Sequence, residues 1–88
     1  MITIYSKTNC PYCDLAKKYL LERDIPFTEV NIMEDSAALE FIKSKGHKTV
    51  PQIYYDDELF VEGGWTGLSE MGEDNLREKL ITLIAKDQ

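Results

Sequence analysis

Cysteine is scarce in this sequence, and the cysteines that are present lie together. Among 88 residues there are two cysteines, and both belong to the segment Cys10-Pro11-Tyr12-Cys13. A secreted scaffold held by disulfides needs more cysteines, spread along the chain. A bridge within so short a segment closes too small a loop to constrain distant parts of the unfolded chain. The sequence therefore excludes a disulfide-rich secreted domain.

Long hydrophobic runs are also missing. No stretch of consecutive apolar residues is longer than three, which excludes a membrane-spanning helix. Residues 1–7 contain no basic segment followed by an apolar stretch, so we expect no signal peptide. The sequence shows no repeats, low-complexity segments or linkers. These features predict one cytoplasmic, monomeric domain over residues 1–88, with no membrane partner.

Basic residues are fewer than acidic ones. Ten Lys and Arg stand against sixteen Asp and Glu, which leaves a net charge of −6. Nucleic-acid binding depends on neutralising phosphates with basic side chains, so we expect no nucleic-acid partner. The excess lies in residues 49–88, because residues 1–48 carry seven basic and seven acidic side chains. An anionic ligand can therefore approach the first half of the chain.

The spacing of apolar residues predicts an α/β chain. Apolar and polar residues alternate in the expected strands, which are residues 2–5, 27–32, 52–55 and 58–62. Helical spacing predicts helices over residues 11–23, from a cap at Asp35 or Ser36 to Lys45, from Thr66 to Gly72, and from Glu73 onward. We expect the first two strands to be parallel and the last two to form an antiparallel hairpin.

Two of these helices carry a clear apolar stripe. We expect one face of the first helix to hold Leu15, Ala16, Tyr19 and Leu20. The last helix carries Leu76, Leu80, Leu83 and Ile84 at helical spacing.

The two cysteines lie where a strand runs into a helix. The unpaired N–H groups and the dipole of a helix N-terminus favour a thiolate, and Lys7 adds positive charge nearby. We therefore expect a lowered pKa and a nucleophilic sulfur at Cys10. Cys13 is expected to be more buried and to act as the resolving thiol that breaks a mixed disulfide.

Three other roles for the cysteines are less well supported. A zinc site needs four ligands, and His47, which we expect in a loop, is the only histidine. Buried inert cysteines are a second alternative, although Pro11 and Tyr12 between them suit a core poorly. An iron–sulfur cluster needs four thiolates, which one chain supplies only with glutathione and a partner subunit. Redox chemistry is the favoured hypothesis.

Three motifs together resemble the dithiol glutaredoxins. They are Cys10-Pro11-Tyr12-Cys13 after a strand, Thr49-Val50-Pro51 before another strand, and Gly63-Gly64 before a helix. The resemblance covers nearly the whole chain. It implies a thioredoxin-like α/β fold, with a four-stranded mixed sheet in the order 2-1-3-4 and helices on both faces. It also implies glutathione as the reducing co-substrate, and no metal.

The resemblance assigns roles to single residues. Cys10 is similar to the family's nucleophile and Cys13 to its resolving cysteine. Pro51 is similar to the family's cis-proline, and the backbone of Val50 would then pair in antiparallel fashion with the cysteine of glutathione. A trans-proline at a strand start is the alternative. The remaining residues expected to contact glutathione in one groove are Lys7, Tyr12, Lys48, Thr49, Gly64, Trp65 and Thr66.

One segment departs from the glutathione-using pattern. After Gly63-Gly64 most such members place an acidic residue, whereas this chain has Trp65-Thr66-Gly67. The segment resembles that of redoxins which take electrons from thioredoxin reductase and pass them to ribonucleotide reductase. We expect Thr66 to cap the following helix. Trp65 is expected either to contact the ligand or to pack in the core on the last helix.

Three functions follow from these features. The first is a glutathione-dependent oxidoreductase that reduces disulfide-containing and glutathionylated proteins, with ribonucleotide reductase as one expected partner. The second is a redoxin that draws electrons from thioredoxin reductase. The third is a glutathione-ligated iron–sulfur carrier, which the dithiol motif disfavours.

Overall fold

Four strands form one mixed sheet in the computed structural model, which describes residues 1–86. The strand order is β2-β1-β3-β4. β1 pairs in parallel with β2 and antiparallel with β3, and β3 and β4 form an antiparallel hairpin. This confirms the expected order and directions of the strands. The strands are β1 (Ile2–Ser6), β2 (Phe27–Asn31), β3 (Gln52–Tyr55) and β4 (Glu58–Val61).

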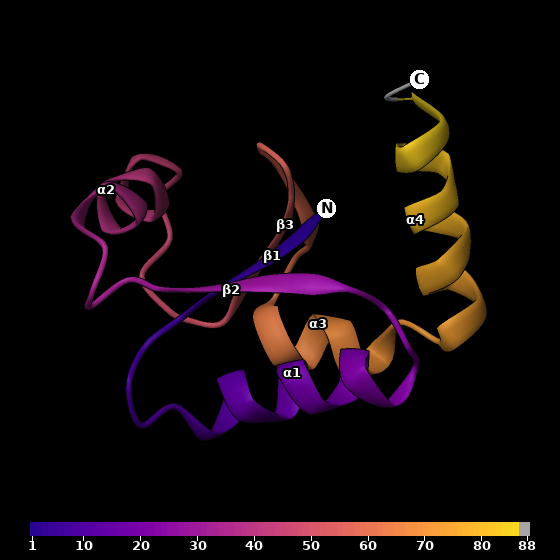
Figure 1. Ribbon diagram of the computed structural model, residues 1–88, viewed down its shortest axis with the longest axis horizontal. Coiled ribbons are helices and arrows are strands. Elements are labelled where there is room, and N and C mark those ends of the chain that lie inside the picture. The colour runs from indigo at the N-terminus through magenta and orange to yellow at the C-terminus, as the bar shows by residue number, and fades with distance from the viewer. Residues whose placement is uncertain (87–88) are drawn as a thin grey trace.

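The helices cover both faces of the sheet. Figure 1 shows α1 and α3 side by side on one face and α2 on the other, as expected. The helices are α1 (Pro11–Glu22), α2 (Ser36–Ser44), α3 (Gly64–Glu70) and α4 (Glu73–Lys86). Most of the predicted element ends agree with these bounds to within one residue.

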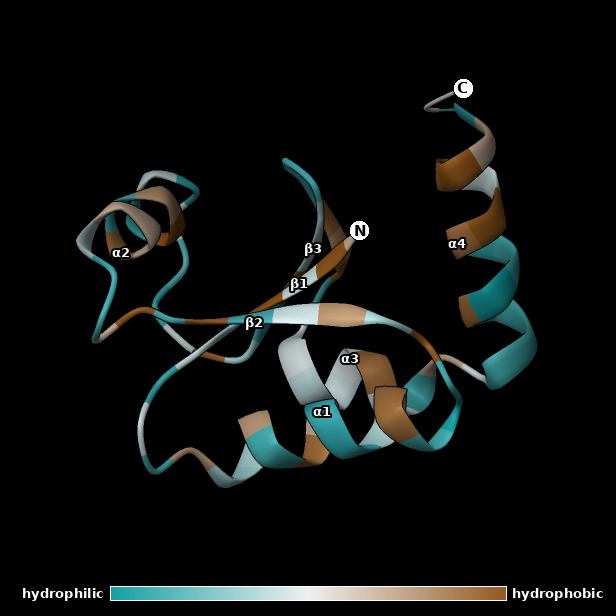
Figure 2. Ribbon diagram, in the orientation of Figure 1, coloured by the Kyte–Doolittle hydropathy of each residue, from teal (hydrophilic) through white to brown (hydrophobic). Residues whose placement is uncertain are grey.

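The core lies between the sheet and the helices α1, α3 and α4. Along β1 the residues alternate between buried and half-buried. Figure 2 shows the apolar residues of this strand as brown bands separated by a paler one. Burying aliphatic and aromatic side chains stabilises the fold at roughly 25 cal/mol per Å² of apolar area. The largest side chains of this core that are less than 2% exposed are Phe60, Ile2, Ile4, Leu20, Ile53, Leu68 and Leu76. Tyr54 is equally buried but packs against Phe41 on the α2 side of the sheet.

Two residues from the expected apolar stripes are not buried. The buried face of α1 carries Cys13, Ala16 and Leu20, whereas Leu15 is 40% exposed. A helix turns by about 100° per residue, so Leu15, two positions after Cys13, points to the opposite side. On α4 only Leu76 is fully buried, and Ile84 is 44% exposed near the helix end.

None of the helices within residues 1–86 combines the length and the apolar character that crossing a bilayer requires.

Candidate active site

The cysteine pair forms the first turn of α1. Cys10 is the N-cap residue, and Pro11 takes the first helical position, where its missing N–H costs no hydrogen bond. The backbone N–H of Cys13 donates to Cys10 Sγ at 3.2 Å. Cys10 and Cys13 form a disulfide with their Cα atoms 5.2 Å apart. The sulfur of Cys10 therefore takes the place of an ordinary capping oxygen, and an N–H donor at this place stabilises a thiolate when the pair is reduced.

Burial distinguishes the two cysteines in the expected direction. Cys10 is 6% exposed and Cys13 1% exposed. An incoming disulfide therefore reaches Cys10 more readily, and Cys13 is protected from solution.

The loop that leads to Cys10 is fixed to the end of β2. The N–H of Ile32 donates to the Ser6 carbonyl at 2.8 Å, and the Asn31 amide donates to Thr8 Oγ1 at 3.1 Å. Asn9 has a φ of 59°, in the left-handed region that asparagine tolerates better than most residues. The sequence analysis did not identify these supports. Asn9, a typical turn residue next to the cysteine motif, was the available signal.

The segment before β3 lies directly against Cys10. Cys10 Sγ is 3.9 Å from the carbonyl oxygen of Val50, forty residues further along the chain. The Val50–Pro51 peptide bond is cis, as predicted. The Gln52 side chain donates to the Thr49 carbonyl at 2.8 Å and holds the segment in place. An extended ligand can therefore lie beside Val50 with its sulfur at Cys10.

Two hollows flank this segment. The first, which we call the α3 groove, has a volume of about 220 Å³, and the second, the α2 pocket, about 340 Å³. Thr49 and Val50 line both of them. The α3 groove is lined by Tyr12, residues 49–51 and residues 63–66. The α2 pocket is lined by Lys7, Ile32, Leu39, Ile42, Lys43 and residues 47–50.

The expected ligand residues divide between these two hollows. We expected Lys7 and Tyr12 to line one groove, but Lys7 lines the α2 pocket and Tyr12 the α3 groove. The reason is that Lys7 precedes Cys10 on the side of α2, whereas Tyr12 lies within α1, next to α3. Lys48 lies with Lys7, and Gly64, Trp65 and Thr66 lie with Tyr12.

The start of α3 differs from the prediction. The helix begins at Gly64, two residues before Thr66, and its N-cap is Gly63, which has a φ of 85° and provides no side-chain cap. Thr66 is therefore the third helical residue, exposed on the groove side, and not a cap. Gly64 has a φ of 57°, and a Cβ there would lie 2.6 Å from the Pro51 carbonyl oxygen. Glycine at this position lets α3 approach the cis-proline segment.

The Trp65-Thr66-Gly67 segment has clear structural contacts. Trp65 is half-buried and its ring meets the Tyr19 ring edge-on, with centroids 5.8 Å apart. This ring contact is with α1, whereas we had expected packing on the last helix. Trp65 packs against the hydrophobic core and also lines the α3 groove, and its contact with a ligand stays a prediction. A Cβ on Gly67 would collide with the Glu62 carbonyl oxygen, so α3 needs glycine there to pack at the end of β4.

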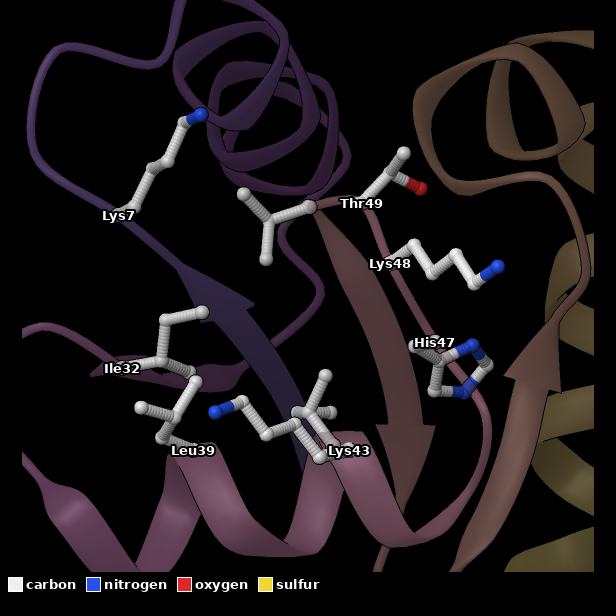
Figure 3. A pocket seen from close by; sticks show the side chains of 9 residues that line it. Lys7, Ile32, Leu39, Lys43, His47, Lys48 and Thr49 are labelled. Atoms are coloured by element: carbon white, nitrogen blue, oxygen red, sulfur yellow. The ribbon is translucent and has the colours of Figure 1, made fainter.

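The α2 pocket combines an apolar floor with positive charge. Its floor includes Ile32, Leu39 and Ile42. Figure 3 shows Lys7 on the loop after β1 and Lys43 on α2, at opposite sides, while the Lys48 side chain points away from both. The sequence analysis missed Lys43, because no motif distinguishes it from other exposed lysines on a helix.

A network of polar side chains fastens α1 to the sheet behind this site. Lys17 Nζ lies 2.8 Å from Glu29 Oε2, and the Ser6 hydroxyl donates to the same oxygen at 2.8 Å. The hydrogen bond from Lys17, with help from Ser6, lowers the pKa of Glu29 below its ordinary value of 4.5. The bond to Glu29 raises the pKa of Lys17 in turn. The charged groups of Lys17 and Glu29 therefore hold α1 against the sheet.

The expected loop position of His47 is confirmed. His47 follows α2, and its Nε2 lies 2.7 Å from the Tyr54 hydroxyl. Burial raises the pKa of Tyr54. Within residues 1–86 no three His, Cys, Asp or Glu side chains are grouped so that they could hold a metal ion.

Comparisons of sequence place this chain among known redox proteins. The family profile described as "Glutaredoxin" matches residues 2–60. The chain is 42% identical over 60 residues to "Glutaredoxin-like protein NrdH" of Lactococcus lactis subsp. cremoris, across 68% of this chain and 83% of that protein. It is 35% identical over 83 residues to "Glutaredoxin 1" of Rickettsia felis, across 91% of this chain and 79% of that protein.

The comparison of structures agrees. The fold is similar to that of buckwheat glutaredoxin in its complex with glutathione, with a TM-score of 0.72 and 25% identity. The match covers 92% of this chain and 76% of that one. The expected thioredoxin-like α/β fold is thus confirmed, and the relatives divide between glutaredoxins and NrdH-type redoxins.

Proposed function

The chain belongs to the glutaredoxin family of dithiol oxidoreductases, and we propose that it uses glutathione to reduce protein disulfides and protein–glutathione mixed disulfides. The observation that carries this proposal is the position of Cys10 Sγ, 3.9 Å from the carbonyl oxygen of Val50, a residue that lines both hollows. A cysteine-containing peptide fits there with its sulfur at Cys10 and one end in each hollow.

The chemistry uses both cysteines in turn. The Cys10 thiolate attacks one sulfur of a protein disulfide, which forms a mixed disulfide and releases one substrate thiolate. The Cys13 thiolate then attacks Cys10 Sγ, which releases the second thiolate and closes the Cys10–Cys13 disulfide. Two electrons pass from the cysteine pair to the substrate.

Glutathione restores the dithiol in the proposed cycle. One glutathione thiolate attacks Cys10 Sγ and forms a mixed disulfide there, and Cys13 leaves as a thiolate that takes up a proton. A second glutathione thiolate attacks the bound glutathione sulfur, so that oxidised glutathione leaves and the Cys10 thiolate returns. With a mixed disulfide between a protein and glutathione, the Cys10 thiolate attacks the glutathione sulfur and releases the protein thiolate. The second glutathione step then restores Cys10, so this reaction needs only Cys10.

The two hollows provide complementary contacts for glutathione. The Val50 backbone would pair with its cysteine, and Lys7 and Lys48 in the α2 pocket would attract the glycine carboxylate. The γ-glutamyl end would lie in the α3 groove, against Tyr12 and the chain from Gly64 to Thr66. The structural relative from buckwheat, which forms a complex with glutathione, supports this placement.

A second candidate uses a different electron source. The Trp65-Thr66-Gly67 segment and the NrdH relative favour reduction by thioredoxin reductase, with ribonucleotide reductase as the protein that receives the electrons. Gly67 has a packing role in α3, so its presence gives this candidate no separate support. For either candidate we propose a monomer of one domain in the cytoplasm, where thiols stay reduced.

Two cysteine variants test the proposed division of labour. Cys10→Ser is expected to lose both reactions, whereas Cys13→Ser is expected to lose reduction of protein disulfides and to keep reduction of protein–glutathione mixed disulfides. The measurement is release of thiol from each substrate with glutathione as the reductant. Loss of both reactions in Cys13→Ser would contradict the proposal.

A further inference from the structure

We propose that the α2 pocket binds the segment of a protein substrate that follows its reactive cysteine, and that it selects an apolar side chain together with an acidic one. This inference rests on the proposed function in one respect, namely that Cys10 attacks a disulfide of a protein. It goes beyond that function because it names which proteins are preferred.

Three basic side chains line the α2 pocket. Lys7, Lys43 and Lys48 make no ion pair with any described residue, although the chain has an excess of acidic side chains. By contrast, Lys17 pairs with Asp14 and Glu29. Lys7 and Lys43, on opposite sides of one hollow and without local partners, provide a positive surface that an acidic ligand complements.

The floor of the pocket is apolar and extends beyond it. Ile32 and Leu39 also line an adjoining hollow of about 440 Å³, together with Met33, Glu34 and Ser36. Met33 is 68% exposed, and its flexible side chain adds apolar surface beside Ile32 and Leu39. An aliphatic side chain placed over Ile32 and Leu39 would bury apolar area on both partners.

Glutathione does not fill this surface. Its glycine end has a carboxylate but no side chain, so Lys7 and Lys48 would be engaged while Ile32, Leu39 and Lys43 would have no ligand contact. A protein segment continues past its cysteine and carries side chains. The occupant that matches the whole pocket is therefore a peptide chain longer than glutathione.

The direction of the occupant follows from strand geometry. This part of the chain runs from Lys48, which lines only the α2 pocket, through Val50 to Pro51, which lines only the α3 groove. A ligand paired in antiparallel fashion with Val50 runs the opposite way. The residues after its cysteine therefore lie in the α2 pocket.

Charge places the two side chains within the pocket. Glu34 lines the adjoining hollow and would repel a carboxylate there. The acidic side chain is thus expected beside Lys43, and the apolar one over Ile32 and Leu39. The preferred sequence in the substrate is cysteine followed by an aliphatic and an acidic residue.

The test uses symmetrical disulfides, each made of two copies of one short peptide. In one peptide the cysteine is followed by leucine and glutamate, and in its twin by asparagine and lysine. Pre-reduced protein is mixed with each disulfide, and the rate constant for release of peptide thiol is measured by chromatography. Because the two halves are identical, Cys10 always attacks a peptide sulfur. No glutathione is present, so the result does not depend on the electron source.

We expect the wild-type protein to react about tenfold faster with the leucine–glutamate peptide, since 1.4 kcal/mol corresponds to a factor of ten. Lys43→Glu should reduce this preference about threefold to tenfold, as expected for reversal of one exposed charge. Lys18→Glu is the matched control, because Lys18 is exposed, lies on α1 and lines neither hollow. It should keep the preference. High salt should lower the preference of the wild type.

Equal rates with both peptides, or equal loss of preference in Lys43→Glu and Lys18→Glu, would overturn the inference. Failure of the proposed function is a separate result. In that case the pre-reduced protein would distinguish the peptides, yet glutathione would not restore its dithiol. A peptide in which only leucine is replaced by asparagine separates the apolar contribution from the charged one, and an unchanged rate would contradict the role of the apolar floor.

Discussion

The two hollows beside Val50 differ in the kind of atoms that shape them. The α3 groove is shaped mainly by backbone: a cis peptide bond, two glycines with positive φ and the first turn of a short helix, with no charged side chain in its lining. The α2 pocket is shaped by side chains, with lysines around an apolar floor. A groove fixed by backbone geometry is suited to binding one constant ligand, such as glutathione. A pocket formed by side chains is suited to selecting among different protein substrates. This difference agrees with the proposed placement of glutathione's γ-glutamyl end in the α3 groove and of protein selectivity in the α2 pocket.

The largest effect is expected from a substitution that disturbs the backbone geometry of the α3 groove. Gly64→Ala places a Cβ 2.6 Å from the Pro51 carbonyl oxygen at a φ of 57°. The left-handed conformation alone costs about 1–2 kcal/mol for a residue with a side chain. We expect kcat/KM with a glutathione mixed disulfide to fall about tenfold or more, because α3 must move away from Pro51.

Gly72→Ala is the matched control for this variant. Gly72 is exposed, and a Cβ there meets nothing within 4 Å. Its activity should equal that of the wild type. Equal activities of Gly64→Ala and Gly72→Ala would show that the groove does not depend on this close approach.

A smaller effect is expected from the α2 pocket when glutathione is the ligand. Lys7→Gln removes a charge that faces the glycine carboxylate, and we expect KM for glutathione to rise about threefold with kcat unchanged. Lys48→Gln should do less, because the Lys48 side chain points away from Lys7 (Figure 3). Lys18→Gln controls for the change in net charge. A larger effect from Lys48→Gln than from Lys7→Gln would reverse the assignment.

A carboxylate added to the α3 groove should have an effect of about twofold. Thr66→Asp places negative charge on an exposed residue that lines the groove, where it can pair with the ammonium of the γ-glutamyl group. We expect KM for glutathione to fall. Ser69→Asp, on the same helix but outside the groove lining, should leave KM unchanged. A fall in both variants would indicate a general charge effect.

The smallest effect is expected from breaking the ion pair between Lys17 and Glu29. Glu29 has a lower pKa in the folded protein than its ordinary value of 4.5, so the folded state binds fewer protons and is favoured above that pH. This contribution is lost as pH falls below 4.5 through the lowered value. Both side chains of the Lys17–Glu29 pair are partly exposed, so Glu29→Gln should cost below about 1 kcal/mol at neutral pH.

The measurement is urea unfolding of Glu29→Gln and wild type at several pH values. The difference in free energy of unfolding should shrink on acidification, and activity with glutathione should not change. A difference that is the same at pH 7 and at pH 3 would contradict the role of this ion pair.

Much of the fold could be predicted from the sequence because its signals are local. Alternation placed all four strands, and Pro11, Asp35 and Gly46 marked helix ends that the structure confirms. Leu15 shows the limit of such patterns, because an apolar residue near a stripe was counted with it although its angle around the helix places it outside.

The sequence predicted which residues belong to the site but not how they are arranged in space. The cysteines and Pro51 follow from motifs, yet only the fold shows that Lys7 and Tyr12 lie in separate hollows. Lys43 could not be found, since an exposed lysine on a helix becomes part of a site only when another segment packs opposite it. The predicted start of α3 at Thr66 was wrong because two consecutive glycines favour a turn, whereas Gly63 and Gly64 form the cap and first residue of the helix.

The most direct test of the central claim compares two electron sources for the oxidised protein. Reduction of the Cys10–Cys13 disulfide is followed through NADPH consumption, once with glutathione and glutathione reductase and once with thioredoxin reductase, with one protein disulfide as the final acceptor. We predict steady turnover with glutathione and little or none with thioredoxin reductase. Turnover with thioredoxin reductase alone would contradict the proposed function and favour the redoxin.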